Sequence, residues 1–211
     1  MLKDISIFKK RIGEFIGFLI ILIITLQAPF VDILILKNSI GEISVTEIIQ
    51  EFLLGIIVIL FIYNSFRYPK IKYGMLMIAG FFSCLLIREL DFLMDKMPFS
   101  WFYIALAIVL FCIVLAFKHK ENTLYGLNHF LKSESYYIMV GGLLLVLAFS
   151  RLIGMQILWQ DLLGKSYIRV VKNAVEEICE LMSYTLCLIA AFKYTVSLRK
   201  MNVEYFASQG C

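Results

Sequence analysis

Twelve ionisable side chains interrupt the apolar stretches of this sequence, and their types are the ones that could do chemistry. Carboxylates hold protons and cations, whereas arginine and lysine balance their charge or bind phosphate. The acids outnumber the bases, so a set that packed together would carry excess negative charge and favour uptake of protons. The acids are Glu47, Glu51, Glu89, Asp91, Asp95, Glu176, Glu177 and Glu180, and the bases are Arg88, Arg151, Arg169 and Lys172.

The spacing of these residues predicts that two helices each carry charge along one face. Residues that are three or four positions apart lie on the same side of an α-helix. One expected stripe is Arg88, Asp91 and Asp95, and the other is Lys172, Glu176 and Glu180, which Arg169 extends at one end and Ser183 and Cys187 at the other. Together with Arg151, these stripes predict a polar seam between helices.

The sequence around these charges is typical of a membrane protein. Hydrophobic residues make up 61% of the 211 residues, against about 45–50% in soluble domains. An isolated charge at the centre of a bilayer costs on the order of 2.5–3.5 kcal/mol even on the mildest scale. We therefore expect the twelve side chains to face one another or water, away from lipid.

Apolar segments of sufficient length predict an all-α fold, a polytopic transmembrane bundle of about six spans that forms one domain over residues 1–211. The expected spans are residues 12–27, 46–66, 73–94, 101–117, 136–159 and 168–193. Proline and charge end the second and third spans, because proline cannot donate to the next helical turn. In the connectors, Pro29 predicts a kink or re-entrant turn within 28–45, and 118–135 is expected to form a short amphipathic helix at the membrane surface.

The distribution of Lys and Arg predicts the orientation of the chain. They crowd the two terminal segments and the connectors after the second and fourth spans, and only Lys37, Lys96 and Lys165 fall in the other connectors. Such an excess marks the cytoplasmic side, so both termini are expected there. The ionisable residues of four spans then lie in the non-cytoplasmic half.

The remaining chemical signals favour structural roles. The five cysteines form no C-x-x-C pair, and His119 and His129 fall in a connector, so no zinc site is implied. The serines within the spans have no nearby histidine that would activate them as nucleophiles. Basic residues do not gather on one solvated face, which argues against nucleic acid as a partner. We expect no cofactor, and the sequence does not identify a metal.

Three short elements resemble a pattern found in uncharacterised bacterial polytopic inner-membrane proteins. They are the pair Glu47 and Glu51 opening a span, the Arg-Glu-x-Asp element at 88–91, and the Glu-Glu-x-x-Glu element at 176–180. The resemblance implies a bacterial inner-membrane setting and a shared importance of these residues. It implies no activity.

Three functions remain open, beside the alternative that the charges only pin helices together. The first is binding or translocation of a cation or proton, with Glu176, Glu177, Glu180, Asp91 and Asp95 as ligands and Arg88 and Arg151 as counter-charges. Because the last span is nearly uncharged beyond Glu180, a continuous pathway would need a homo-oligomer or a conformational change. The second is a non-enzymatic sensor or effector subunit of a bacterial defence or stress system that acts with a protein partner. The third is a membrane-embedded enzyme for lipid phosphates, in which the bases hold phosphate.

Overall fold

The computed structural model describes residues 2–37, 44–94, 100–164 and 167–209, and every regular element within these ranges is helical. Six helices in this part of the chain are long and apolar enough to cross a membrane, which confirms the predicted all-α class and the number of candidate spans. They are Ile7–Ile35, Val45–Arg67, Pro69–Glu89, Trp101–Lys118, Ser135–Ile153 and Arg169–Lys200.

The first candidate span is interrupted near its end. Helix α1 (Leu2–Thr25) is followed by α2 (Gln27–Phe30) and a π-helical turn, η1 (Val31–Ile35). Proline has no N–H to donate to the carbonyl four residues earlier, which accounts for a break just before Pro29. The expected kink is therefore present at Leu26.

The second and third spans are α3 (Val45–Arg67) and α4 (Lys72–Glu89), joined by a 3₁₀ turn, η2 (Pro69–Ile71). The Ser44 hydroxyl accepts a hydrogen bond from the N–H of Glu47 (3.1 Å), which caps the start of α3. At Leu90 the backbone leaves helical geometry, and a separate turn, α5 (Asp91–Met94), follows. The helix that was expected to run from 73 to 94 is thus broken.

The second half of the chain contains the longest helix. Helix α6 (Trp101–Lys118) leads into α7 (Lys120–Leu131), so the connector expected to be helical is a helix. The fifth span comprises α8 (Ser135–Leu144), η3 (Leu145–Phe149) and α9 (Ser150–Ile153), with α10 (Gln156–Leu163) after it. Helix α11 (Arg169–Gln209) continues well beyond residue 193, where the sixth span was expected to end.

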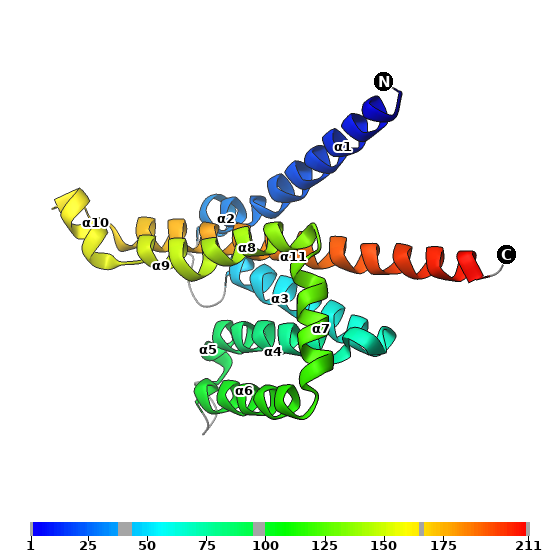
Figure 1. Ribbon diagram of the computed structural model, residues 1–211. Helices are drawn as coiled ribbons and strands as arrows, with labels where there is room; N and C mark the ends of the chain where they lie inside the picture. The colour runs from blue at the N-terminus through cyan, green and yellow to red at the C-terminus, as the bar shows by residue number, and fades with distance from the viewer. Residues whose placement is uncertain (1, 38–43, 95–99, 165–166, 210–211) are drawn as a thin grey trace.

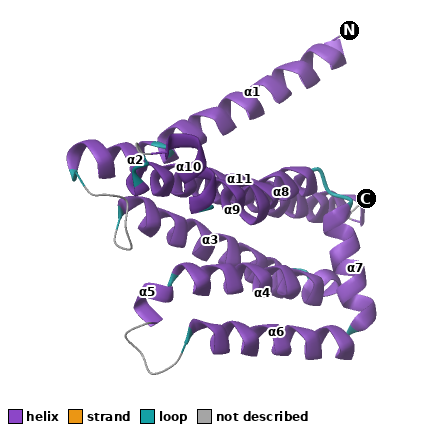
Figure 2. Ribbon diagram, turned by 90° about the vertical axis from the view of Figure 1, so that its left-hand side faces the viewer, coloured by secondary structure: helices purple, strands orange, loops and turns teal. Residues whose placement is uncertain are grey.

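The long helices form an open row. Helix α11 packs on α8 and α3, α3 packs on α4, and α4 packs on α6. Figures 1 and 2 show this order, with α1 diverging from α11 and α7 running across the ends of the other helices. We call the end that holds Gln50, Arg88 and Glu180 the charged end, and the opposite end, which holds Phe130 and Tyr194, the α7 end.

Helix α7 crosses α4 at a pair of glycines. A Cβ atom on Gly74 would lie 2.6 Å from backbone atoms of Gly126, and a Cβ atom on Gly126 would lie 2.7 Å from the Ile71 carbonyl oxygen. No larger residue fits either position without moving a backbone. The Asn122 side chain fixes the same crossing, because it accepts from the N–H of Tyr73 (3.1 Å) and donates to the Pro69 carbonyl (2.9 Å).

Candidate functional site

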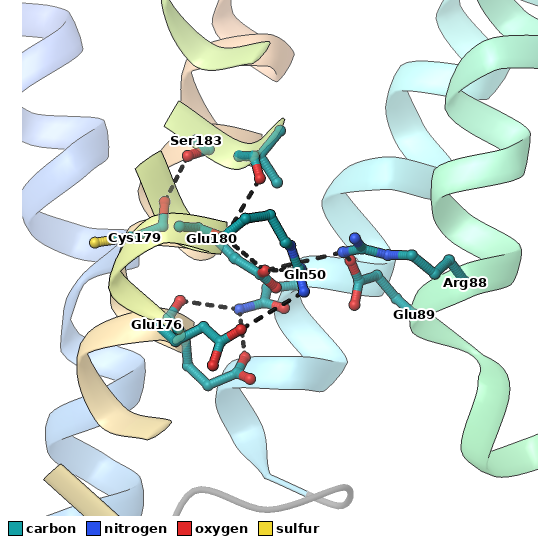
Figure 3. A network of polar contacts seen from close by, with 12 residues as sticks. Gln50, Arg88, Glu89, Glu176, Cys179, Glu180 and Ser183 are labelled. Carbon is teal, nitrogen blue, oxygen red and sulfur yellow. Dashed lines mark hydrogen bonds and ion pairs between the residues drawn. The ribbon is translucent and has the colours of Figure 1, made fainter. Parts of the chain in front are cut away.

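An alternating chain of charges lies at the charged end and joins three helices, α4, α9 and α11. Figure 3 shows part of it, with Arg88 and Glu89 reaching from α4 toward Glu180 on α11. In order along the network, the members are Lys172, Glu176, Arg151, Glu180, Arg88 and Glu89. The structure therefore joins Arg88, from one predicted stripe, to Lys172, Glu176 and Glu180 of the other through Arg151 and Glu180.

Glu180 is the centre of this network and is only 3% exposed. Its carboxylate forms a close ion pair with Arg151 and accepts a hydrogen bond from the Ser150 hydroxyl at 2.8 Å. Arg88 lies 3.9 Å away on the other side. Because a buried charge is costly unless it is paired, these partners allow Glu180 to remain between the helices.

The branch on α4 consists of Arg88 and Glu89. Arg88 forms a close ion pair with Glu89, and the fully buried Tyr184 donates its hydroxyl to the same carboxylate at 2.5 Å. Arg88 also lies 3.4 Å from the Tyr184 hydroxyl oxygen. A tyrosine on α11 thereby links the last turn of α4 to the network.

The other branch lies where α9 ends and α11 begins. Lys172 forms an ion pair with Glu176 (2.8 Å) and donates to the carbonyl of Gly154 (3.2 Å). Arg151 lies 3.6 Å from the same Glu176 carboxylate. A Cβ atom at Gly154 would lie 2.5 Å from that carboxylate, so a larger residue at position 154 would displace the Glu176 carboxylate from its present place.

The charges of this network balance. Three bases alternate with three acids, so paired residues alone carry none of the surplus acid that the sequence suggested. This part of the site is consistent with helices pinned together by ion pairs. Any binding chemistry must come from the remaining carboxylates.

Glu177 is the carboxylate that stands out beside the network. Its carboxylate accepts from the side-chain amide of Gln50 (3.0 Å), and the same amide reaches the Glu177 carbonyl (3.0 Å). Gln50 is 1% exposed, so this contact lies within the helix interface. Among the residues that the structure describes, no lysine or arginine is within ion-pair distance of Glu177, whereas Glu180, Glu47 and Glu89 are near enough to repel it.

Glu47 and Glu51 bring further negative charge from α3. Glu51 is partly exposed and is repelled by Glu89 across the α3–α4 interface. Glu47 lies in the first turn of α3. With Glu177, these residues place carboxylates from both α3 and α11 at the charged end.

Three other predicted residues lie outside this arrangement. Asp91 and Arg169 are exposed and form no ion pair with another described residue. Of the predicted stripe, only Arg88 lies on α4, because the break at Leu90 removes the helical register that would have aligned Asp91 with Arg88. Asp95 lies outside the described residues.

Sequence reasoning missed several polar residues of this end. Asp32 is fully buried and accepts hydrogen bonds from the N–H groups of Val45 and Thr46 (both 2.9 Å) and from the Thr46 hydroxyl (2.6 Å). A carboxylate is favoured at the positive start of a helix, so Asp32 anchors α3. A search for charge could have found Asp32, but not Gln50 or Tyr184, which are uncharged.

The carboxylates do not form a chelating site. Within the described ranges, no three His, Cys, Asp or Glu side chains come together in a way that could hold a metal ion. At Glu177 the site thus offers a single carboxylate with the Gln50 amide as its hydrogen-bond donor.

Comparison with known proteins provides no relative from which a function could be transferred. No protein-family model, curated protein or solved structure matches this chain.

Proposed function

We propose that this chain is a multi-pass membrane protein that binds a proton or a monovalent cation at Glu177, between α3 and α11. The observation that carries the proposal is the pairing pattern at the charged end. Each base of the network has carboxylate partners, whereas Glu177 has only the amide of Gln50.

Desolvation supplies the driving force for binding. A carboxylate that is moved out of water and kept near other carboxylates is stabilised by taking up a positive charge. Gln50 serves either form of the site, because its amide N–H donates to a carboxylate and its carbonyl oxygen can accept from a carboxylic acid. Glu47 and Glu51 would draw cations to the same end.

In this arrangement of helices, the interior between Glu177 and the α7 end favours binding of a proton or cation over its conduction. Toward the α7 end, the Ser183 hydroxyl donates to the carbonyl of Cys179 (2.5 Å) and is thus occupied within its own helix. Beyond it, Cys187, Ala190 and Ala191 are fully buried along α11. Transport would require the helices to rearrange.

The orientation of the site follows from the positive-inside rule. Arg67, Lys70, Lys118 and Lys120 all lie at the α7 end, which the rule assigns to the cytoplasm. Glu177 would then face the non-cytoplasmic side of a bacterial inner membrane, with both chain termini in the cytoplasm.

Infrared difference spectroscopy of the full chain in lipid nanodiscs tests proton binding at Glu177 directly. The pH would be stepped with Na⁺, K⁺ or choline as the cation at constant ionic strength. We expect a carboxylic-acid C=O band that changes with pH or with the small cations and is absent in Glu177→Gln. Asp161→Asn, which removes an exposed carboxylate at the same end, should leave the band in place.

Two results would contradict the proposal. One is a wild-type spectrum identical to that of Glu177→Gln under all conditions. The other is loss of the same band in Asp161→Asn, since the signal would then not belong to the helix interface.

A second candidate, a sensor subunit with two states, is favoured by one observation. Arg151 holds both Glu176 and Glu180 although its side chain is 46% exposed, so a partner or ligand could reach it and re-pair the network. An enzyme for lipid phosphates has less support, because Arg88, Arg151 and Lys172 are all engaged by carboxylates.

A further inference from the structure

An apolar groove lies on the side of α11 that faces α1, far from Glu177. It encloses about 730 Å³ between α1, α3 and α11, and its walls include Phe18, Ile56, Leu60 and Phe192. Lining residues of α11 run from Leu188 to Lys200, which corresponds to a length of about 18 Å at 1.5 Å per residue. The groove exists because α1 diverges from the row, as Figures 1 and 2 show.

The mouth of the groove is polar and lies at the α7 end. Arg11 pairs with Glu134 (2.8 Å) and Glu14 (3.2 Å), and Lys193 lies 3.3 Å from each of the same two carboxylates. These four charges cancel. Lys200 adds a positive charge and forms no ion pair with another described residue.

Ser197 lies one turn before Lys200 on the same helix and also lines the mouth. Its exposed hydroxyl and the Lys200 ammonium are donors of the kind that bind phosphate oxygens. The groove therefore combines apolar walls with a mouth that carries net positive charge.

We infer that this groove binds one anionic phospholipid, with an acyl chain between α1, α3 and α11 and the phosphate near Ser197 and Lys200. The volume lies within the range of about 300–1,000 Å³ that is typical of small-molecule sites. Negative headgroups match the charge of the mouth and are enriched on the cytoplasmic face, where basic residues attract them.

Native mass spectrometry of the detergent-solubilised full chain tests this inference. The protein would be titrated separately with phosphatidylglycerol, with phosphatidylcholine of the same acyl chains, and with glycerol 3-phosphate, which has no acyl chain. We expect one phosphatidylglycerol to bind at least fivefold more tightly than phosphatidylcholine, and glycerol 3-phosphate not to bind measurably.

Three variants locate the bound lipid. Lys200→Gln should weaken phosphatidylglycerol binding about fivefold, whereas Lys132→Gln, an exposed lysine at the same end that does not line the groove, should not. Ser197→Trp, which fills the mouth from an exposed position, should weaken it at least tenfold without changing the melting temperature. Leu60→Phe fills the groove from the opposite wall and should act in the same direction.

Equal binding of the two phospholipids would overturn the inference, as would binding of glycerol 3-phosphate as tight as that of the lipid. Unchanged affinity in both Ser197→Trp and Leu60→Phe would also overturn it. The site is independent of Glu177, so Glu177→Gln should leave lipid binding intact whether or not the proposed proton site is correct.

Discussion

The two ends of the interface between α3, α4 and α11 are held together by different interactions. At the charged end, Glu180 and its partners fix the helices through ion pairs and hydrogen bonds. At the α7 end, Phe61 packs against Phe130 and Tyr194, with ring centroids 5.8 and 6.3 Å apart. The same long helix, α11, thus takes part in an ionic interface and in an aromatic one.

This difference shows how stability and adaptability can be separated within one row of helices. Aromatic packing depends on shape and tolerates little movement, because interiors are packed as densely as crystals. Ion pairs can be exchanged among several partners, and Arg151 and Glu180 each already have two. We therefore expect the α7 end to set the stability of the protein and the charged end to respond to ions.

The largest effect should come from removing the aromatic centre. Phe61→Ala should lower the free energy of unfolding by about 3–5 kcal/mol, since a fully buried ring is lost and a cavity remains. Phe52→Ala is the matched control, because Phe52 lies on the same helix and is 69% exposed; its effect should stay within about 0.5 kcal/mol. Unfolding by denaturing detergent in mixed micelles measures both. Equal effects would mean that the aromatic end does not dominate stability.

A smaller effect is expected from neutralising the centre of the network. Glu180→Gln should cost about 3 kcal/mol, because it leaves the charges of Arg151 and Arg88 facing a neutral amide. In a double-mutant cycle, Arg151→Gln and Glu180→Gln should show a coupling of about 1–3 kcal/mol. Glu121→Gln, an exposed change on α7, serves as control. A wild-type stability for Glu180→Gln would indicate that Glu180 is already neutral in the folded protein.

The smallest effect concerns the exposed ion pairs that tie α1 to α8 and α11. Hydrogen bonds from Arg11 and Lys193 lower the pKa of Glu134 from about 4.5 to about 2. Since its folded pKa is depressed, this contribution is fully present above pH 4.5 and is lost as the pH falls toward 2. Glu134 is 63% exposed, so the contribution should be at most about 1 kcal/mol.

Added salt provides the contrast between exposed and buried ion pairs. High NaCl should screen the Glu134 contribution but change that of Glu180 little, because buried pairs are screened much less. The measurement is the pH dependence of stability in wild type and Glu134→Gln, each at low and high salt. A pH dependence between 4.5 and 2 that survives in Glu134→Gln would assign it to another group.

The parts of the structure that were predictable from sequence are those that depend on local properties. Hydropathy identified the six candidate spans, because the length and apolarity of a segment do not depend on what it packs against. The positions of Arg88 and Glu180 along their predicted spans indicated that both lie at the same end. Helical spacing did not predict the position of Asp91 correctly, because the helix is broken at Leu90 and no proline or glycine near Leu90 indicates the break.

Features that depend on which faces meet were not predictable. Helix α6 is apolar on every side and has no buried residue, so its sequence does not indicate which of its faces contacts α4. Gln50 and Tyr184 were missed because their roles arise only when α3, α4 and α11 come together. The balance of three bases against three acids likewise depends on tertiary contacts.

The crossing of Gly74 and Gly126 has a mechanical consequence for the whole row. The Asn122 hydrogen bonds tie α7 to the start of α4 beside these glycines, and α7 is the chain segment that connects the edge helix α6 to α8. Helix α4 is thereby clamped at its first turns, while its last turn is held to α11 only by side chains. Any tilting of α4 should pivot about the glycines, and the displacement would be greatest around Arg88.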